Sequence, residues 1–420
     1  MESQRNFFHT VKKWCVVLFF CAIVTYGLIV LASTAVFYTP WAILKNMNED
    51  KRDEMISLGI FSPKSHPLYR PSLYSFLREP NAKGKTTAIG DTYKAYGVTV
   101  KIDLQEEDND SLGFPNTIPA SDAAVLFVGD SFGVGVSVGS KLCPAAVYAK
   151  MTNAKVYNAS NGSWGPVQYV DIIKMMTQEL PKEKRFSGKD VVVLFYLGND
   201  FDVDMLQYEM RKMQTDHVVS WLFALKPLRE WVNFLQLANW KDQHVQSHGQ
   251  DQQTQTTDEI PHGIYAPIPM KCETVRGLPF AWHLSYLGWI HQGYDPKRWN
   301  AIDKVIGELK SFEAKGLRIK VVLVPTSVQI LSDNIDWASV PKDSRIEADT
   351  KKLKEIQDQT KEKATAIFKK YGFDVLDLAD VMNASPQKCL YYQPVDTHCT
   401  ALGYEAIGKA IAAKWPDLGK

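Results

Sequence analysis

The chain of 420 residues has almost no excess charge, no paired-cysteine motif and no repeat at a fixed period. Its formal net charge is +1, and without a basic excess to neutralise phosphates we expect no nucleic-acid partner. The six cysteines include no C-x-x-C pair, so neither a zinc ribbon nor a thioredoxin-type site is expected. The acidic run at residues 106–110 lacks the glycine and the distal glutamate of an EF-hand, and we expect it to be a solvated loop rather than a metal site.

What is present is the composition of a globular protein, with 45% hydrophobic and 23% charged residues. This length predicts one large domain with additions, or two domains. Four cysteines, Cys143, Cys272, Cys389 and Cys399, follow the N-terminal apolar segment, and an even number permits disulfides in an oxidising compartment. Cys389 and Cys399 are close in sequence and form the favoured pair; the alternative is four free, buried thiols.

An apolar segment near the N-terminus, residues 14–38, contains no charged side chain and is long enough to cross a bilayer as a helix. The preceding residues 1–13 carry basic side chains, and Trp41 follows as an interfacial aromatic. We therefore predict a single-pass membrane anchor, with residues 1–13 in the cytoplasm and the rest of the chain periplasmic or extracellular. The alternative is a cleaved signal peptide, whose apolar region is usually shorter.

Beyond the anchor, residues 46–118 are polar and irregular, and we expect a connecting segment with short strands such as Tyr96–Ile102. Residues 119–415 alternate short apolar strands with helical patterns, which predicts an α/β domain with a parallel five-stranded sheet and helices on both faces. The predicted strands are Ala123–Val128, Lys155–Asn158, Val191–Leu197, Ile319–Val324 and Phe373–Leu378. The predicted helices are Lys141–Met151, Val167–Glu179, Trp299–Lys315, Asp349–Tyr371 and Ala401–Lys414.

An insert at residues 201–298 interrupts this alternation between the third and fourth strands. Its tryptophan-rich part, Trp221–Trp240, is expected to belong to the core or a lid; the alternative is a helix that rests on the membrane surface. The glutamine-rich tract Asp242–Glu259 has no apolar periodicity and is expected to be a mobile loop.

Polar residues follow the predicted strands, at the sheet edge where open α/β folds bind ligands. Ser131 follows the first strand in Gly-Asp-Ser, and His398 lies in the loop before the last helix. A serine hydroxyl needs a base within hydrogen-bond reach before it is a good nucleophile, and His398 is the natural base. Asp396, two positions earlier, is placed to orient the imidazole.

Donors for a developing oxyanion are also available at this edge. Asn199 follows the third strand and offers a side-chain amide. The glycine-containing turn at residues 158–168 follows the second strand and precedes a helix, so it offers backbone N–H groups. The sequence therefore predicts a serine nucleophile, a histidine base and an oxyanion site at one edge of the sheet.

These four blocks, in this order, resemble the SGNH (GDSL-type) hydrolase superfamily over about residues 119–415. The resemblance implies a flavodoxin-like three-layer α/β/α sandwich, with Ser131 as nucleophile, His398 as base and Asp396 as its support. It also implies an oxyanion site made by the N–H of Ser131, the N–H of Gly162 or Ser163, and the Asn199 side chain. No metal and no cofactor are implied.

The short Asp-x-His spacing in DTHCT is similar to that of the alginate O-acetyltransferase group of the same superfamily. We therefore expect an ester hydrolase or O-acyltransferase that acts on acyl esters, with cell-surface carbohydrate as the favoured substrate. The alternatives are a lipase or thioesterase of the same superfamily, and a non-catalytic glycan-binding domain. GDSFG also fits the nucleophile elbow of α/β-hydrolases, but that fold takes its acid and histidine from separate loops.

Overall fold

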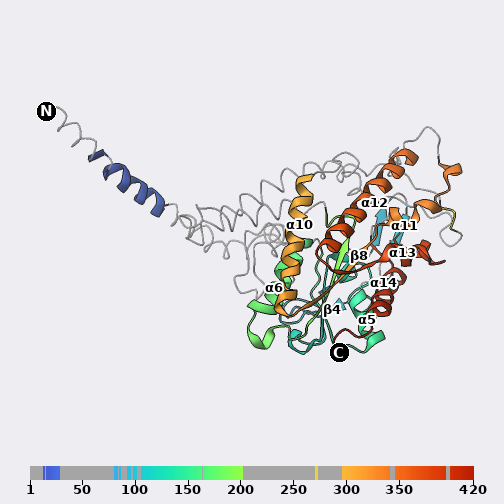
Figure 1. Cartoon of the computed structure of the whole chain (residues 1–420), viewed down its shortest axis with the longest axis horizontal. Coiled ribbons are helices and arrows are strands. Elements are labelled where there is room, and N and C mark those ends of the chain that lie inside the picture. Colours follow the sequence, from blue (N-terminus) through green and yellow to red (C-terminus); the bar gives the residue numbers. More distant parts are fainter. Residues whose placement is uncertain are drawn as a thin grey trace. The chain divides into compact units, whose positions relative to one another are not determined.

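The computed structural model of the chain is shown in Figure 1. It forms two compact units, residues 1–64 with 210–256, and residues 65–209 with 257–420. The structure describes residues 13–14, 16–28, 80–83, 85–86, 92–95, 98–101, 106–162, 164–201, 270–272, 296–340, 346–393 and 398–420. The tryptophan-rich and glutamine-rich parts of the insert lie outside these residues, as do Ser163 and Asp396.

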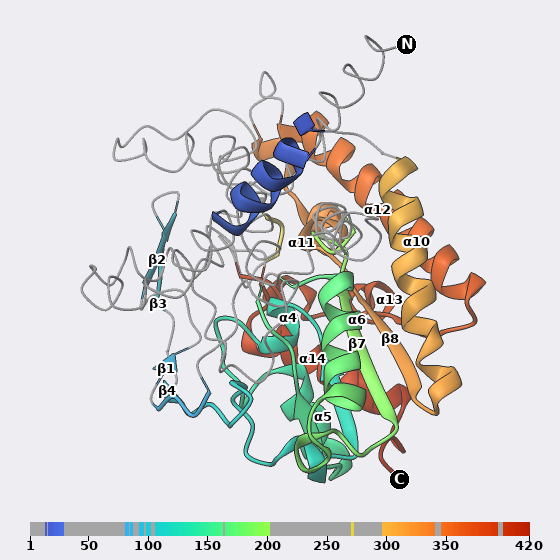
Figure 2. The ribbon, with the colours of Figure 1, turned by 90° about the vertical axis from the view of Figure 1, so that its left-hand side faces the viewer.

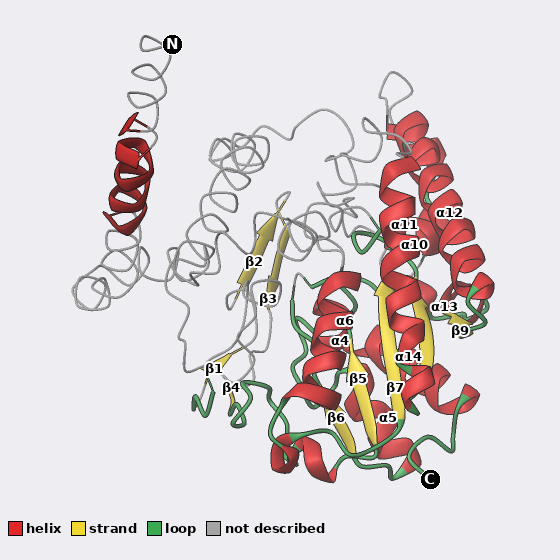
Figure 3. Ribbon diagram, turned by 60° about the vertical axis from the view of Figure 1, so that its left-hand side comes forward, coloured by secondary structure: helices red, strands yellow, loops and turns green. Residues whose placement is uncertain are grey.

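The second unit is built on a sheet of five parallel strands in the order β6-β5-β7-β8-β9 (Figure 3). In sequence order this arrangement is 2-1-3-4-5, which is the flavodoxin-like form of the doubly wound fold. The prediction of a flavodoxin-like parallel sheet of five strands is therefore confirmed. The strands are β5 (Val125–Val128), β6 (Val156–Asn158), β7 (Asp190–Tyr196), β8 (Arg318–Val324) and β9 (Asp374–Asp377).

The central strand β7 is buried along its whole length, because helices cover both faces of the sheet. Its side chains alternate between two hydrophobic clusters: Val192 and Leu194 belong to one, and Val191 and Val193 to the other. The first cluster includes side chains of α5 (Pro144–Thr152), α11 (Ser327–Leu331), α13 (Leu378–Asn383) and α14 (Ala401–Lys414). The second includes side chains of α6 (Pro166–Lys174), α10 (Pro296–Ser311) and the C-terminal half of α12 (Ile346–Lys370).

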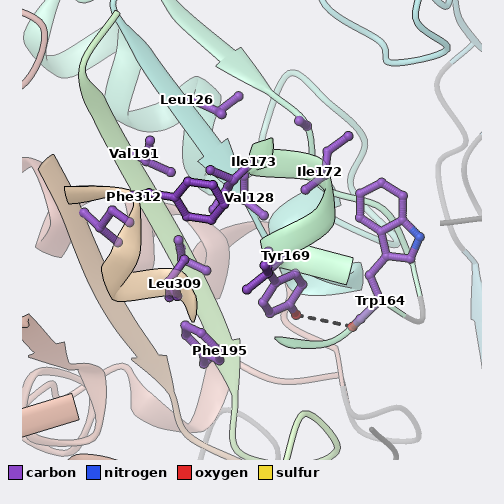
Figure 4. Packing of buried hydrophobic residues seen from close by; sticks show 14 of the residues in the cluster. Leu126, Val128, Trp164, Tyr169, Ile172, Ile173, Val191, Phe195, Leu309 and Phe312 are labelled. Atoms are coloured by element: carbon purple, nitrogen blue, oxygen red, sulfur yellow. Dashed lines mark hydrogen bonds between the residues drawn. The ribbon is translucent and has the colours of Figure 1, made fainter. Parts of the chain in front are cut away.

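The second cluster is drawn in Figure 4, where Leu309 and Phe312 lie beside Val191 of β7. On the same face, the hydroxyl of Tyr169 donates a hydrogen bond of 3.3 Å to the carbonyl oxygen of Trp164, just before α6 begins. Burial of a large apolar side chain stabilises a fold by roughly 1.5–3 kcal/mol. The two clusters therefore hold the helices on the sheet and fix where its strands end.

All five predicted helices are present, and two of them are extended by a tighter or wider turn. A π-helical turn, Met175–Glu179, continues α6, and a 3-10 turn, Glu313–Lys315, follows α10. The sequence did not predict α11, α13 or the four-residue helix α4 (Ser131–Val134). These helices are too short to show an amphipathic period.

Two small antiparallel pairs come before the sheet (Figure 2). Strands β2 (Thr92–Ala95) and β3 (Val98–Lys101) form one pair, so a short strand exists near the predicted Tyr96–Ile102. Strands β1 (Lys85–Thr86) and β4 (Glu106–Glu107) form the other.

The acidic run at residues 106–110 is not a solvated loop, and that expectation was wrong. Glu107 and Asn109 are buried. Oδ1 of Asp110 accepts hydrogen bonds from the N–H groups of Leu112 and Phe114, at 2.8 and 3.0 Å, and Oδ2 accepts one of 2.6 Å from the Tyr157 hydroxyl. Asp108 is exposed and Asp110 half-buried, so the run is only partly solvated, and the Asp110 carboxylate satisfies donors that would otherwise lack a partner.

The disulfide joins Cys272 to Cys389, and Cys399, which is buried, takes no part in it. The expected pairing of Cys389 with Cys399 was therefore wrong. Cys399 forms an isolated antiparallel bridge with Tyr392, and it packs against α14, where a Cβ on Gly403 would lie 2.9 Å from its own Cβ. Cys272 and Cys389 are 117 residues apart in sequence, so spacing alone could not identify them as the bonded pair.

At the N-terminus, residues 13, 14 and 16–28 are helical. Large apolar side chains on this segment, among them Leu18, Phe19 and Phe20, are exposed. Within the described part of the chain, no helix is both long and apolar enough to span a bilayer. Residues 29–38 of the predicted anchor lie outside the described residues.

Candidate active site

Ser131 is the first residue of α4 and lies three residues beyond the end of β5, at the carboxyl edge of the sheet. The preceding Asp130 caps α4, since its Oδ1 accepts a hydrogen bond of 2.8 Å from the N–H of Phe132. The helix ends at Gly135, whose φ of 78° is in the left-handed region that favours glycine. The turn thus places a half-buried serine hydroxyl at a fixed point above the strand.

His398 comes from the loop between η10 (Lys388–Leu390) and α14, and two sets of backbone bonds hold this loop. Its carbonyl oxygen accepts a hydrogen bond of 2.9 Å from the N–H of Gln393. Thr400 caps α14 through its side chain, and its own N–H donates to Tyr391 O at 2.9 Å. The histidine is therefore held between a short bridge and a capped helix.

The fold brings Ser131 and His398 together across 267 residues of sequence. The distance between His398 Nε2 and Ser131 Oγ is 2.8 Å, which is within hydrogen-bond range. The ring of Phe132 lies beside the imidazole, with ring centroids 5.3 Å apart, and it stacks on Tyr196 at the end of β7, with centroids 3.9 Å apart. An apolar wall therefore fixes the imidazole on one side.

The loop after β6 packs against the serine turn. A Cβ on Gly133 would lie 2.3 Å from Ser160 Oγ, so only glycine fits at that point of α4. Asn158 Nδ2 donates to Gly133 O at 2.8 Å, and Asn161 N donates to Gly129 O at 3.1 Å. These bonds tie the glycine-containing turn to the backbone on both sides of Ser131.

Of the two residues predicted as the second oxyanion donor, only Gly162 lies in the described part of the chain. Its N–H donates to the side-chain oxygen of Asn161 at 3.1 Å, and a Cβ added to Gly162 would meet no atom within 4 Å. The space beside Gly162 is open. The other predicted donor, Ser163, lies outside the described residues.

Asn199 lies in the turn that follows β7, the strand adjacent to β5. The turn is held by Asp200, whose Oδ2 accepts hydrogen bonds from Tyr196 N at 2.8 Å and from the Tyr169 hydroxyl at 3.0 Å. Asn199 Oδ1 is buried without a hydrogen-bond partner in the described part of the structure. Asn199 is therefore at the same edge of the sheet as Ser131.

One residue of this edge was missed by the sequence reasoning. Asp130 is fully buried, and burial raises the pKa of its carboxyl to about 6, while the Phe132 N–H and the charge of His398 act in the opposite direction. Its position directly before Ser131 was visible in the sequence, but its burial was not. No group of three or more potential metal ligands occurs among the described residues.

The structure therefore brings Ser131 and His398 together and places Gly162 and Asn199 at the same edge. Asp396 lies outside the described residues, so its predicted support of His398 stays a prediction. The arrangement offers a serine hydroxyl, an imidazole within hydrogen-bond distance of it and neighbouring polar groups in a partly buried position. These are the parts that acyl transfer requires.

No protein-family model matches the chain, and no curated protein sequence matches it. Its fold is similar to those of several solved structures. One is an extracellular lipase from Streptomyces rimosus, which is 10% identical in sequence; the match covers 69% of this chain and 98% of that chain, with a TM-score of 0.37. A phospholipase A1 from Streptomyces albidoflavus is similar at 11% identity, 70% of this chain and 99% of that chain, also with a TM-score of 0.37.

An acetyl xylan esterase from the rumen bacterium Butyrivibrio proteoclasticus is similar at 10% identity, over 76% of this chain and 67% of that chain, with a TM-score of 0.32. The three TM-scores lie below 0.5, so these likenesses carry no argument about the activity of this chain. The functional argument rests on the geometry of its own residues.

Proposed function

We propose that this protein is a serine-dependent hydrolase or acyltransferase that acts on ester bonds, with Ser131 as nucleophile and His398 as general base. The observation that carries the proposal is the 2.8 Å distance between Ser131 Oγ and His398 Nε2 at the carboxyl edge of the sheet. A serine hydroxyl is a weak nucleophile at neutral pH, and a base in contact with it makes attack on an ester carbonyl feasible.

The reaction has two halves. In the first, Ser131 Oγ bonds to the ester carbonyl carbon while His398 Nε2 takes the hydroxyl proton. The alcohol leaves with that proton, and the acyl group stays on Ser131 as an ester. In the second, water or a sugar hydroxyl gives its proton to His398 and attacks the acyl carbon. The bond from that carbon to Ser131 Oγ breaks, and His398 returns the proton to Oγ, which restores the free serine.

The negative charge that develops on the carbonyl oxygen needs hydrogen-bond donors. We assign the Ser131 N–H and the Asn199 side-chain amide to this role, together with the N–H of Gly162 or Ser163. The support is that these residues follow β5, β7 and β6 at one edge of the sheet. Gly162 N–H already donates to Asn161, which favours Ser163 as the third donor. Asp396 is the proposed partner of the imidazole.

The proposed substrate is an acyl ester of cell-surface carbohydrate, and the proposed location is outside the cytoplasm, behind an N-terminal membrane anchor at residues 14–38. The Cys272–Cys389 disulfide supports an oxidising compartment. The exposed apolar side chains between Trp14 and Leu28 support burial in a lipid phase. The DTHCT block supports acyl transfer through its similarity to the alginate O-acetyltransferase group.

The test uses the full chain in detergent or lipid, incubated with p-nitrophenyl acetate with and without an oligosaccharide acceptor. Release of p-nitrophenol that depends on Ser131, with acetate appearing on the sugar, indicates an acyltransferase. Release without sugar acetylation indicates an esterase, and a preference for long acyl chains or thioesters indicates the lipase or thioesterase alternative. If the wild-type protein releases nothing and a fluorophosphonate does not label it, the proposal is wrong.

A further inference from the structure

Asp130 is a fully buried carboxyl group that lies between β5 and Ser131. Only one of its oxygens has a hydrogen-bond partner among the described residues: Oδ1 accepts from the N–H of Phe132 at 2.8 Å. Oδ2 is buried and makes no hydrogen bond in the described structure. The N–H groups of Asp130 itself and of Gly133 also lower the pKa of this carboxyl, so backbone donors offset part of the cost of its burial, and Oδ2 is the oxygen without a described partner.

Capping does not require the charge. Asparagine and serine cap a helix as well as aspartate does, and neither brings a buried charge with it. A buried carboxylate with an unpaired oxygen is costly, which is why burial raises the pKa of Asp130 to about 6. At neutral pH the group is still mainly ionised. The structure thus keeps a negative charge beside the nucleophile at a cost to stability.

His398 is a cation whose charge acts on Asp130. The charge of His398 lowers the pKa of Asp130, so the two groups attract each other when both are ionised. Phe132 follows Asp130 by two residues, and the centroid of its ring lies 5.3 Å from that of the His398 imidazole. His398 also contacts the Ser131 hydroxyl at 2.8 Å. One short turn therefore links the carboxyl, the nucleophile and the imidazole.

We propose that Asp130 is a positioning residue for the reaction at Ser131, with two separable roles. Its Oδ1 holds the serine turn through the Phe132 N–H, and its negative charge stabilises the imidazolium that His398 becomes when it takes the Ser131 proton. The inference rests on the proposed function. The proton moves only between Ser131 and His398, and Asp130 acts through its charge.

Other titratable side chains also occur on the elements around this pair. Asp396 is two residues before the histidine. Tyr196 on β7 and Tyr404 on α14 contact the Phe132 ring. Glu107 accepts a hydrogen bond from Ser140 N, and Cys143, before α5, has a thiol whose pKa is raised by burial. Burial keeps the Cys143 thiol neutral in the acid range, so that range reports on the carboxylates and the histidine.

The test compares Asp130→Asn, which keeps the cap acceptor and removes the charge, with Asp130→Ala, which removes both. Asp190→Asn is the matched control, because Asp190 is also a buried carboxylate with one unpartnered oxygen, at the amino end of β7. The measurement is kcat/KM with p-nitrophenyl acetate from pH 5 to pH 9. The thermal unfolding of each variant is measured in the same buffers.

We expect Asp130→Asn to lower kcat/KM by roughly tenfold and to move the acid limb of the profile about one pH unit lower, because the imidazolium loses an attracting charge. We expect Asp130→Ala to lower kcat/KM further, and Asp190→Asn to keep the acid limb of the wild-type pH profile. If Asp130→Asn folds and keeps both the wild-type kcat/KM and the acid limb of the wild-type pH profile, then Asp130 acts only as a helix cap and the inference is overturned.

A second measurement keeps the inference testable without turnover. The proton NMR titration of His398 in Ser131→Ala is compared with that in Ser131→Ala/Asp130→Asn, and we expect the titration midpoint to fall in the double variant. An unchanged midpoint contradicts the electrostatic role. If the wild-type protein shows no Ser131-dependent turnover at all, it is the proposed function that fails, and the titration still decides the role of Asp130.

Discussion

Two buried aspartates lie at opposite edges of the same sheet and have opposite surroundings. Asp190 begins β7 at the amino edge, where its Oδ2 accepts from Arg318 Nη2 at 2.5 Å and from the N–H of Gly419 at 2.7 Å. Asp130 follows β5 at the carboxyl edge, where its Oδ1 accepts a hydrogen bond of 2.8 Å from Phe132 N. The Asp190 carboxylate is paired with the guanidinium of Arg318, whereas no described hydrogen bond pairs the Asp130 carboxylate with a cation.

The two aspartates therefore differ in role: Asp190 stabilises the fold, and Asp130 lies beside the proposed nucleophile. At the amino edge a charge ties β8 and the C-terminal tail to the sheet, because one of its oxygens is bound by a guanidinium and a backbone N–H. At the carboxyl edge a charge is kept beside a serine and a histidine, at a cost to stability. The comparison predicts that changes at the carboxyl edge mainly alter turnover and that changes at the amino edge mainly alter the free energy of unfolding.

The largest effect is expected from Ser131→Ala, which should lower kcat/KM with p-nitrophenyl acetate by about 10⁴-fold or more. The unfolding midpoint should change little, because a half-buried hydroxyl is lost without a cavity. His398→Ala should lower turnover nearly as far, and the double variant should be no worse than either single variant, since the two residues act as a unit. Losses that multiply in the double variant would contradict a shared step.

The Cys272–Cys389 disulfide offers a further test of the comparison between the two edges. It lies near the carboxyl edge, but its own role is structural. Replacing Cys272 and Cys389 by serine should lower the free energy of unfolding by about 3–5 kcal/mol, as expected for a link across 117 residues. The loop that carries His398 follows Cys389 directly, so turnover should fall as well. Urea unfolding and steady-state kinetics measure the two effects. Cys143→Ser, a free buried thiol, is the control and should change both far less.

Asn199→Ala should lower kcat by roughly 10²–10³-fold, or about 3–4 kcal/mol of transition-state stabilisation, and leave KM nearly unchanged. Asn116→Ala is a matched control, because Asn116 pairs by its side chain with the backbone of Asn158 on the edge strand β6. That variant should lose stability rather than turnover. Full activity in Asn199→Ala would remove this residue from the oxyanion site.

The smallest effect concerns the pH dependence of stability. The pKa of Asp130 is raised from 3.8 to about 6, so between these values the folded protein binds more protons than the unfolded chain, and stability falls as the pH rises. Relative to wild type, Asp130→Asn should therefore gain about 2 kcal/mol between pH 4 and pH 7. The constant cost of burying an amide cancels in this difference.

Chemical denaturation at several pH values measures this gain. Asp190→Asn is measured in parallel, and about 1–2 kcal/mol should be lost with its charged hydrogen bond. Equal pH dependence in the two variants would break the comparison between the edges.

Much of this architecture was predictable because the signal was local. The apolar runs that became β5, β7 and β8 are short and continuous, as strands buried on both faces must be. The order Ser131, Asn199, His398 along the chain, each after a strand or before a helix, was enough to place them at one edge.

The features that sequence could not supply depend on long-range packing. The bond between Cys272 and Cys389 joins an insert to the histidine loop, and nothing in the spacing shows that these segments meet. The acidic run around Asp110 read as solvated because its partners, such as Tyr157, are distant in sequence. The burial of Asp130 follows from helices on both faces of the sheet, so its raised pKa was invisible in Gly-Asp-Ser.

The central claim is that His398 activates Ser131 as a nucleophile. Intact-mass analysis of the full chain after incubation with a fluorophosphonate tests it most directly, with Ser131→Ala and His398→Ala treated in parallel. The account predicts one adduct per wild-type chain, mapped to Ser131, none in Ser131→Ala and labelling slowed by at least about a hundredfold in His398→Ala. An adduct that persists in Ser131→Ala, or labelling that does not depend on His398, would contradict it.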